Sequence, residues 1–290
     1  MEFQAPKLVG DDAEGTGEVF EVKYLYDKTA HLATSPQLYK QIMVGVFERV
    51  FTTGNVFRAE KHATTRHLNE YTSIDVECGF ITDHTDIMRL ETSLMRSIVA
   101  RLKETCAEEF KTLGAELPLL PEGDCFPRLK LREVQKIIGV PEESDLDPAG
   151  ERAIAEWAKK EHGSDFVFVT HYPVVKRPFY TYEDEADPGY TKSFDLLFRG
   201  AEITTGGQRR HEYENLVAGA KAKGLNPDNF SFYFQAFRYG LPPHGGWGMG
   251  LERLTQKFLG LENVKEATPF PRDINRIDTL LSEDPNRTAD

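Results

Sequence analysis

The sequence predicts an α+β protein in which helices cover one side of an antiparallel sheet. A polar segment at residues 61–70 separates two stretches of strand character, as in a long hairpin. A long apolar stripe between residues 85 and 111 is typical of a helix that packs on a sheet. No internal repeat or low-complexity segment is present. Hairpins with flanking helices favour an antiparallel sheet over a parallel one.

The first part of the chain combines short strands with one helix. Residues 18–60 alternate short strand patterns with a helix at about 36–50. Pro36 directly follows Ser35, and proline is favoured at the first position of a helix.

The hairpin at residues 57–77 carries polar side chains suited to a nucleotide. Arg58 and Glu60 are two apart, so on a strand they point to the same face. A guanidinium suits a phosphate, and a carboxylate suits an exocyclic amine. Tyr71 offers an aromatic face for a base. The second strand places Ile74 and Val76 on one face, and Ser73, Asp75 and Glu77 on the other. A hairpin with ordinary surface ion pairs would also fit these residues.

The middle of the chain is helical and then more polar. The stripe on the long helix at about 85–111 consists of Ile87, Leu90, Leu94, Ile98 and Leu102. Residues 113–163 contain proline-rich breaks and two shorter helices, which are predicted to end at Gly139 and Gly163. We interpret this segment as an insertion over the sheet, not a separate domain.

The last part of the chain returns to strands and ends in helices. Residues 166–170 and 196–203 are predicted strands, and Asn226-Pro227 is a cap that opens a helix. Aromatic residues at helical spacing then predict core packing: Phe230, Tyr233, Phe234 and Phe237.

A second glycine-rich stretch indicates close backbone approach to a ligand. Glycines stand at positions 245, 246, 248 and 250. Leu251, Leu254 and Phe258 follow at helical spacing, with Arg253 among them. Glycine spacing alone is weak evidence, and a strand-to-helix turn with a solvated arginine would look the same.

Composition limits the classes of function. The chain has 290 residues, 40% hydrophobic and 28% charged, with a formal net charge of −12. This charge argues against broad nonspecific nucleic-acid binding, but not against a local basic groove. Cys78, Cys106 and Cys125 form no metal-type pair, which fits a reducing cytoplasm. No signal peptide or membrane-spanning apolar run is evident, so we expect a cytoplasmic protein without membrane contact.

Two of these stretches resemble halves of one ATP site. FRAEKHATTRHLNEYTSIDVE, residues 57–77, and GMGLERL, residues 248–254, resemble motifs 2 and 3 of the class II aminoacyl-tRNA synthetases. The two stretches in this order make the alternative interpretations of each much weaker.

Further blocks resemble the aspartate-specific members of that family, of archaeal and eukaryotic type. They are SPQLYKQ at 35–41, SFDLLFRGAEITTGGQR at 193–209 and FPRD at 270–273. APKLVGDDAEGTGEVF, residues 5–20, looks like the tail of motif 1 followed by a substrate loop. The resemblance covers residues 3 to about 277.

The resemblance implies a fold and an organisation. The family fold is a six-stranded antiparallel sheet flanked by helices, so residues 1–290 are expected to form one catalytic domain, with 113–163 inserted. The family's anticodon-binding domain and most of the motif 1 helix, which builds its dimer interface, are absent from this sequence. We expect a trimmed chain rather than a shortened paralogue, and a homodimer.

The resemblance also implies an aspartate pocket. Lys40 and Arg209 match positions that bind the side-chain carboxylate, which Arg209 can hold bidentately. Asp75 and Glu14 match positions that hold the α-ammonium group. The polar positions are matched by Ser35 and Gln37.

For ATP, the resemblance assigns most of the remaining polar residues. Arg58 matches the α-phosphate ligand, Glu60 the reader of the adenine amine, and Tyr71 the aromatic under adenine. Arg253 is expected above adenine, near the γ-phosphate. The loop residues expected to meet the phosphates are Arg66 and His67.

Magnesium is the implied cofactor. Its expected ligands are Asp195, Glu202 and Thr205, and hard oxygen donors suit this ion. Glu202 joins Arg58 and Arg253 as an expected catalytic residue. Thr205 stands where serine is more usual.

The implied reaction converts L-aspartate and ATP to aspartyl-adenylate, and transfers the aspartyl group to the acceptor end of tRNA-Asp. Whether tRNA-Asn is also charged stays open. Three alternatives remain. One is an asparaginyl-tRNA synthetase, although an amide does not call for both Lys40 and Arg209. Another is a tRNA-independent asparagine synthetase of the same fold. The third is a non-catalytic binding module, which would be expected to lose phosphate or magnesium ligands.

Overall fold

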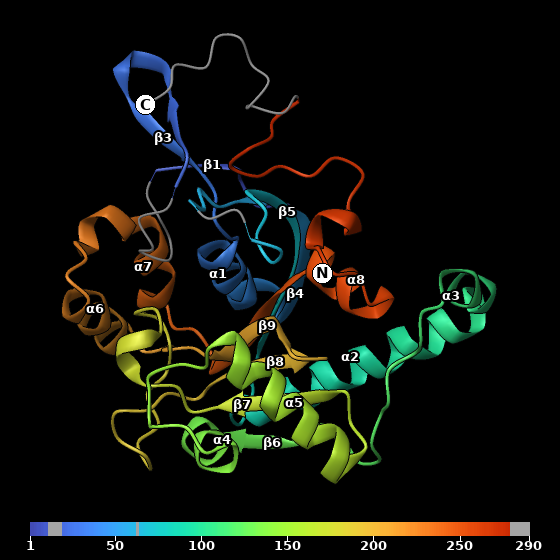
Figure 1. The fold of residues 1–290 in the computed structure, drawn as a ribbon. Helices are drawn as coiled ribbons and strands as arrows, with labels where there is room; N and C mark the ends of the chain where they lie inside the picture. The colour runs from blue at the N-terminus through green and yellow to red at the C-terminus, as the bar shows by residue number, and fades with distance from the viewer. Residues whose placement is uncertain (11–18, 62–63, 279–290) are drawn as a thin grey trace.

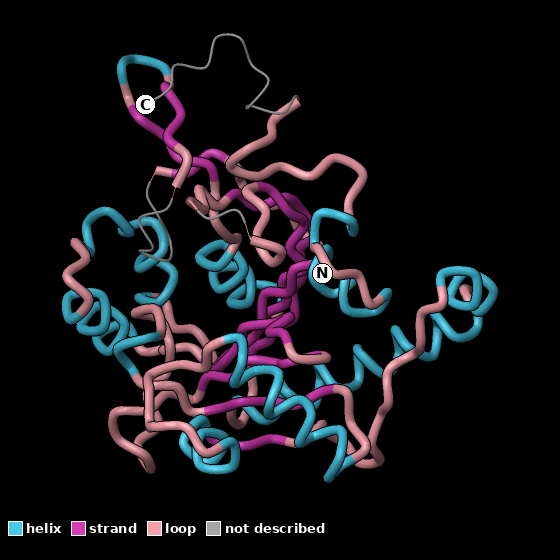
Figure 2. Tube along the Cα trace, in the orientation of Figure 1, coloured by secondary structure: helices cyan, strands magenta, loops and turns pink. Residues whose placement is uncertain are grey.

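The computed structural model describes residues 1–10, 19–61 and 64–278, and strands run through the middle of the molecule with helices around them (Figure 2). Within these residues the larger sheet has seven strands, in the order β4-β5-β10-β9-β8-β7-β6. In that order they are β4 (Arg49–Phe57), β5 (Glu70–Gly79), β10 (His244–Gly250), β9 (Ala201–Gln208), β8 (Ser193–Phe198), β7 (Phe166–Thr170) and β6 (Arg128–Lys130).

The larger sheet is mixed. Neighbours from β4 to β7 are antiparallel, whereas β6 pairs with β7 in parallel. The expectation of a six-stranded, wholly antiparallel sheet was therefore wrong at one edge. The added strand comes from the segment 113–163, which contributes to the sheet as well as covering it.

A smaller sheet precedes the larger one in the chain. Its strands, in the order β1-β3-β2, are β1 (Leu8–Val9), β2 (Glu21–Lys23) and β3 (Thr29–Leu32). Figure 1 places this sheet at the opposite end of the molecule from β6. This sheet ends at Leu32, and residues 33–36 lead from it to the first helix.

The α-helices of the described residues are α1 (Gln37–Phe47), α2 (His84–Thr105), α3 (Ala107–Leu113), α4 (Leu131–Ile138), α5 (Pro148–His162), α6 (Tyr213–Ala222), α7 (Ser231–Arg238) and α8 (Leu251–Leu259). The 3₁₀ turns are η1 (Leu25–Asp27), η2 (Val174–Lys176), η3 (Pro227–Phe230) and η4 (Val264–Ala267). The helix predicted at 85–111 is interrupted, because Cys106 has non-helical dihedral angles between α2 and α3. Gly139 and Gly163 end α4 and α5 in the left-handed conformation, as predicted.

Helices cover both faces of the sheet, not one. Along β7, Phe166 and Phe168 join the core under α2, while Val167 and Val169 join a second core under α4 and α5. This follows from the alternation of side chains along a strand. On the same face as α5, α1 packs against β4 and β5 at the other end of the sheet. The strands between these helices are left to form the floor of a cavity.

The aromatic residues predicted as core are buried. Phe230, Tyr233, Phe234 and Phe237 pack with Leu38 and Phe179 in a third cluster, which fixes α1 against η3 and α7. Among the described residues, no helix is long and apolar enough to cross a membrane.

Candidate active site

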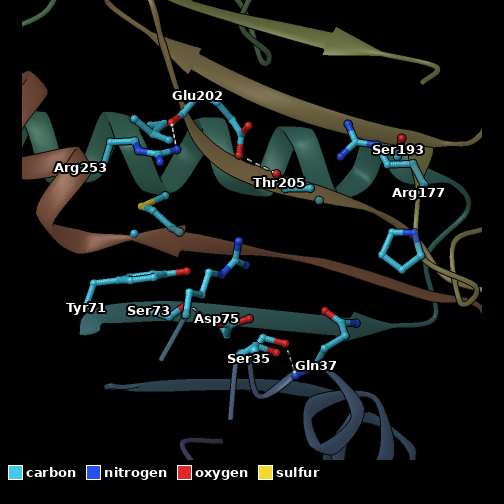
Figure 3. A pocket seen from close by; sticks show the side chains of 18 of the residues that line it. Ser35, Gln37, Tyr71, Ser73, Asp75, Arg177, Ser193, Glu202, Thr205 and Arg253 are labelled. Atoms are coloured by element: carbon cyan, nitrogen blue, oxygen red, sulfur yellow. Dashed lines mark hydrogen bonds between the residues drawn. The ribbon is translucent and has the colours of Figure 1, made fainter. Parts of the chain in front are cut away.

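A cavity of about 690 Å³ lies over the central strands β5, β10 and β9. Its floor includes Ser73 and Asp75 on β5 and Thr205 on β9 (Figure 3). Gly248 on β10 also lines the cavity. Gly248 is in register with Asp75 on one side and with Thr205 on the other. A glycine between these two polar side chains leaves room for a ligand above the sheet.

Most residues assigned from the sequence line this cavity: Ser35, Gln37, Arg58, Glu60, Arg66, His67, Tyr71, Asp75, Glu202, Thr205, Arg209 and Arg253. They come from α1 and the residues before it, the hairpin, β9 and the residue after it, and α8, and the fold brings them to one place. Lys40 and Asp195 are not among the residues that line the cavity. Glu14 lies outside the described residues.

Lys40 is buried behind the wall of the cavity. Its side chain is 1% exposed, and its Nζ donates to Oδ2 of Asp75 at 2.8 Å and to the carbonyl of Trp247 at 2.9 Å. Oε2 of Glu77 lies 3.4 Å from the same Nζ. Ser73 also donates a short hydrogen bond to Asp75. The ammonium group thus acts here on two protein carboxylates.

Glu77 is a central residue of the site to which the sequence reasoning assigned no role. Its side chain is fully buried, and its Oε1 accepts a hydrogen bond from Nε of Arg209 at 3.0 Å. Burial alone would raise the pKa of Glu77, but the charges of Arg209 and Lys40 outweigh it and lower that pKa below its ordinary value. The alternation in β5 that places Glu77 on the face of Ser73 and Asp75 was the signal that could have identified it.

Arg209 is held from several sides and still reaches the cavity. Besides Glu77, its Nη2 donates to the carbonyl of Gly246 at 3.0 Å, and Oε1 of Gln37 lies 3.5 Å away. A Cβ atom on Gly246 would lie 1.9 Å from the carbonyl oxygen of Val76 and 2.5 Å from Oε2 of Glu77. Only glycine fits beside this ion pair.

The other end of the cavity is rich in arginine. Nη1 of Arg253 donates to the backbone carbonyl of Glu202 at 2.9 Å, and its Nη2 to that of Arg66 at 3.3 Å. The ring of Tyr71 lies beside Gly250, where a Cβ atom would be 3.9 Å from two of its ring atoms. The arrangement offers cations and an aromatic ring to a nucleoside triphosphate.

The oxygen donors assigned to magnesium are divided. Glu202 and Thr205 line the cavity, and Oγ1 of Thr205 donates to Oε1 of Glu202 at 2.8 Å. Asp195, in register with Thr205 on the neighbouring strand β8, is buried and pairs with Arg177 at 2.8 Å. Burial raises the pKa of Asp195 to about 6 against the opposing charge of Arg177. Two oxygen donors that line the cavity fit an ion that obtains its other ligands from phosphates and water.

The cavity over the antiparallel strands β5, β10 and β9 thus combines arginines at one end with an acid–base ion-pair cluster at the other. The family model described as tRNA synthetases class II (D, K and N) matches residues 1–274. The chain belongs to this family.

Relatives within the family are named for aspartate. The chain is 52% identical over 280 residues to an aspartate--tRNA(Asp/Asn) ligase of Thermus thermophilus, covering 95% of this chain and 65% of that protein. It is 41% identical to the aspartate--tRNA(Asp) ligase of Thermococcus kodakarensis, covering 96% of this chain and 64% of that one. The chain thus spans about two thirds of the length of these curated relatives.

Solved structures show the same architecture. The asparaginyl-tRNA synthetase of Pyrococcus horikoshii, in complex with asparaginyl-adenylate, superposes with a TM-score of 0.87 at 34% identity, over 95% of this chain and 64% of that one. A putative aspartyl-tRNA synthetase from Leishmania major superposes with a TM-score of 0.82 at 31% identity, over 95% of this chain and 61% of that one.

Proposed function

We propose that this chain activates L-aspartate with ATP, forming aspartyl-adenylate, and transfers the aspartyl group to the acceptor end of tRNA-Asp. The observation that carries this proposal is the division of one cavity into two chemically different ends. Arg209 and Asp75 offer opposite charges at one end. Arg58, Arg66 and Arg253 line the other. An amino acid with an extra carboxylate suits the first end, and a polyphosphate suits the second.

At the amino-acid end, Asp75 receives the α-ammonium group and Arg209 receives the side-chain carboxylate. Lys40 contributes its charge from behind Asp75, and Glu77 holds both cations in place. Ser35 and Gln37 complete the polar lining, with Glu14 as a further ammonium ligand. An amide side chain would leave the cation of Arg209 without an anionic ligand partner, which favours aspartate over asparagine.

At the ATP end, Tyr71 stacks under adenine, Glu60 accepts from its amine, and Arg58 binds the α-phosphate. Arg253 lies over the other side of adenine and reaches the γ-phosphate. Arg66 and His67 also meet the phosphates. The substrate carboxylate attacks the α-phosphorus itself, so no protein nucleophile is required. Arg58 and Arg253 stabilise the charge that develops on the phosphates.

Glu202 and Thr205 are proposed to hold Mg²⁺, and Asp195, which does not line the cavity, is proposed as a third oxygen donor from the neighbouring strand. When bound, the ion neutralises charge on the departing pyrophosphate. Thr205 positions the carboxylate of Glu202 through its 2.8 Å hydrogen bond.

The acceptor range is proposed to include tRNA-Asn as well as tRNA-Asp. Relatives at 47–52% identity are named aspartate--tRNA(Asp/Asn) ligases, while those at 41–42% are named for tRNA(Asp) alone. The higher identity to the first group supports this wider range.

A cytoplasmic homodimer is the proposed state of assembly, with residues 1–290 as one catalytic domain and 113–163 as an insertion within it. Large apolar side chains are exposed at the edge strand β4 and beside it, namely Val46, Phe47, Phe51 and Phe80. Exposed apolar side chains near a sheet edge suit contact with a second copy of the chain. The cysteines are free, which suits a reducing compartment.

Aspartylation of tRNA tests the proposal. Labelled aspartate should become acid-precipitable with tRNA-Asp only when ATP and Mg²⁺ are present. Absence of labelled tRNA at high enzyme concentration, or equal labelling with asparagine, would contradict it.

A further inference from the structure

An ion pair ties the ATP end of the cavity to helix α5. Nη2 of Arg66, in the loop of the hairpin, donates a short hydrogen bond to Oε2 of Glu151, in the first turn of α5. The two side chains are only 25% and 12% exposed. Glu151 belongs to the segment 113–163, to which the reaction proposed above assigns no role.

The two partners stand in different positions relative to the cavity. Arg66 lines the cavity, whereas Glu151 is not among the lining residues. Glu151 therefore holds Arg66 from behind. A guanidinium group has several donors, so one hydrogen bond to Glu151 leaves others for a ligand.

Both partners are fixed by their surroundings. The backbone carbonyl of Arg66 accepts from Arg253, and that of Thr65 accepts from the backbone N–H of Val264 at 3.0 Å. On the other side, Ile154 and Ala158 anchor α5 in the core against β7. The carboxylate of Glu151 is thus presented by a rigid helix.

A loop arginine without such a partner would lose rotamer freedom when it binds phosphate, and this loss weakens binding. We propose that Glu151 is a positioning residue that orients Arg66 toward the terminal phosphates of ATP, so that the segment 113–163 sets the affinity for ATP. This inference rests on the proposed function, because it takes the ligand at Arg66 to be a triphosphate.

The test compares ATP binding with turnover. Glu151→Gln keeps the shape and removes the charge, and Glu151→Ala removes the acceptor altogether. The Kd and KM for ATP should rise about threefold in the first variant and about tenfold in the second, as expected for loss of a partly buried charge-assisted hydrogen bond. The kcat of ATP–pyrophosphate exchange and the KM for aspartate should change less than about twofold, since only the phosphate contact is affected.

Two controls separate positioning from a general structural effect. Glu156 is an exposed glutamate on the same helix, and Glu156→Gln should leave every parameter unchanged. Arg66→Ala should weaken ATP binding itself, and adding Glu151→Gln to it should have no further effect. The inference would be overturned if Glu151→Gln had the same effect in the unmutated chain and in Arg66→Ala. An unchanged Kd for ATP in Glu151→Gln would also overturn it.

The Kd for ATP can be measured by calorimetry without aspartate, so this test is independent of the exchange reaction. If the unmutated chain binds ATP but shows no aspartate-dependent exchange, the proposed function fails while the role of Glu151 is still decided by the Kd values. If it does not bind ATP, both fail.

Discussion

Glu77 and Arg209, 132 residues apart in the chain, form a buried ion pair with 3.0 Å between Oε1 and Nε. The pair joins β5 to the end of β9 across β10. The Nζ of Lys40 lies 3.4 Å from Oε2, the other carboxylate oxygen of Glu77. Asp75 balances the second cation. Asp75 and Arg209, which line this end of the cavity, therefore belong to a neutral cluster of two cations and two anions, in which each charge compensates its neighbours.

Replacing Glu77 by Gln should change how stability depends on pH. The pKa of Glu77 is lowered in the folded protein, because Arg209 and Lys40 outweigh its burial. The stability that Glu77 contributes is therefore present above the pKa of this carboxyl group in the unfolded chain, and is lost as the pH falls. The free energy of unfolding should differ most between the unmutated chain and Glu77→Gln above about pH 5, and this difference should shrink toward about pH 3. Urea titrations at several pH values measure it.

Glu104→Gln serves as the control, because Glu104 forms an exposed ion pair with Arg101. It should leave the pH dependence unchanged. A constant difference between Glu77→Gln and the unmutated chain across this pH range would contradict the assigned charge state of Glu77.

Removing the charge of Lys40 should destabilise the protein as well as impair aspartate binding. Lys40→Met leaves Asp75 and Glu77 buried with less compensation, so the free energy of unfolding should fall by about 3–5 kcal/mol. Lys160 is 83% exposed, and Lys160→Met should have little effect. Chemical denaturation of both variants decides the matter. Equal stability of the two would show that the Lys40 cluster is not structural.

Gly246 is predicted to tolerate no side chain. In Gly246→Ala the new methyl group would collide with the backbone of Val76 and the carboxylate of Glu77. We expect the free energy of unfolding to decrease by at least about 2 kcal/mol. At Gly10 nothing lies within 4 Å of the corresponding position, so Gly10→Ala should stay within about 0.5 kcal/mol. A stable Gly246→Ala protein with normal activity would refute the packing argument.

Glu202→Gln tests the proposed magnesium site. The substitution removes a negative charge but keeps an acceptor for Thr205, so the fold should be retained. The rate of ATP–pyrophosphate exchange should fall at least about a hundredfold, as for loss of a group that acts on the transition state. Magnesium titrations should shift to higher concentration. An exchange rate and magnesium requirement like those of Glu161→Gln, an exposed control, would reject the assignment.

The sequence predicted the residues on the floor of the cavity better than the buried residues that hold them in place. Alternation along β5 was enough to place Ser73 and Asp75 on one face, because strand periodicity determines side-chain direction. The direction of Lys40 was not predictable, since a long side chain on α1 can reach either a ligand or the acids on β5. Only the fold decides between them.

Contacts between segments far apart in the chain were also not predictable from the sequence. The strand β6 is only three residues long and pairs in parallel with β7, so it leaves no clear periodic signal. Likewise, the contact between Arg66 and Glu151 joins segments 85 residues apart, and nothing in the sequence around Glu151 indicates it. Such contacts follow from the packing of α5 on the sheet, which local sequence patterns do not encode.

The central claim is that the cavity activates aspartate in preference to asparagine. Isotopic exchange between ATP and pyrophosphate reports adenylate formation directly and needs no tRNA. With the unmutated chain, exchange should require L-aspartate and Mg²⁺, and should be at least about a hundredfold faster in kcat/KM with aspartate than with asparagine. Exchange that is equally fast with asparagine, or that does not depend on the added amino acid, would contradict the account.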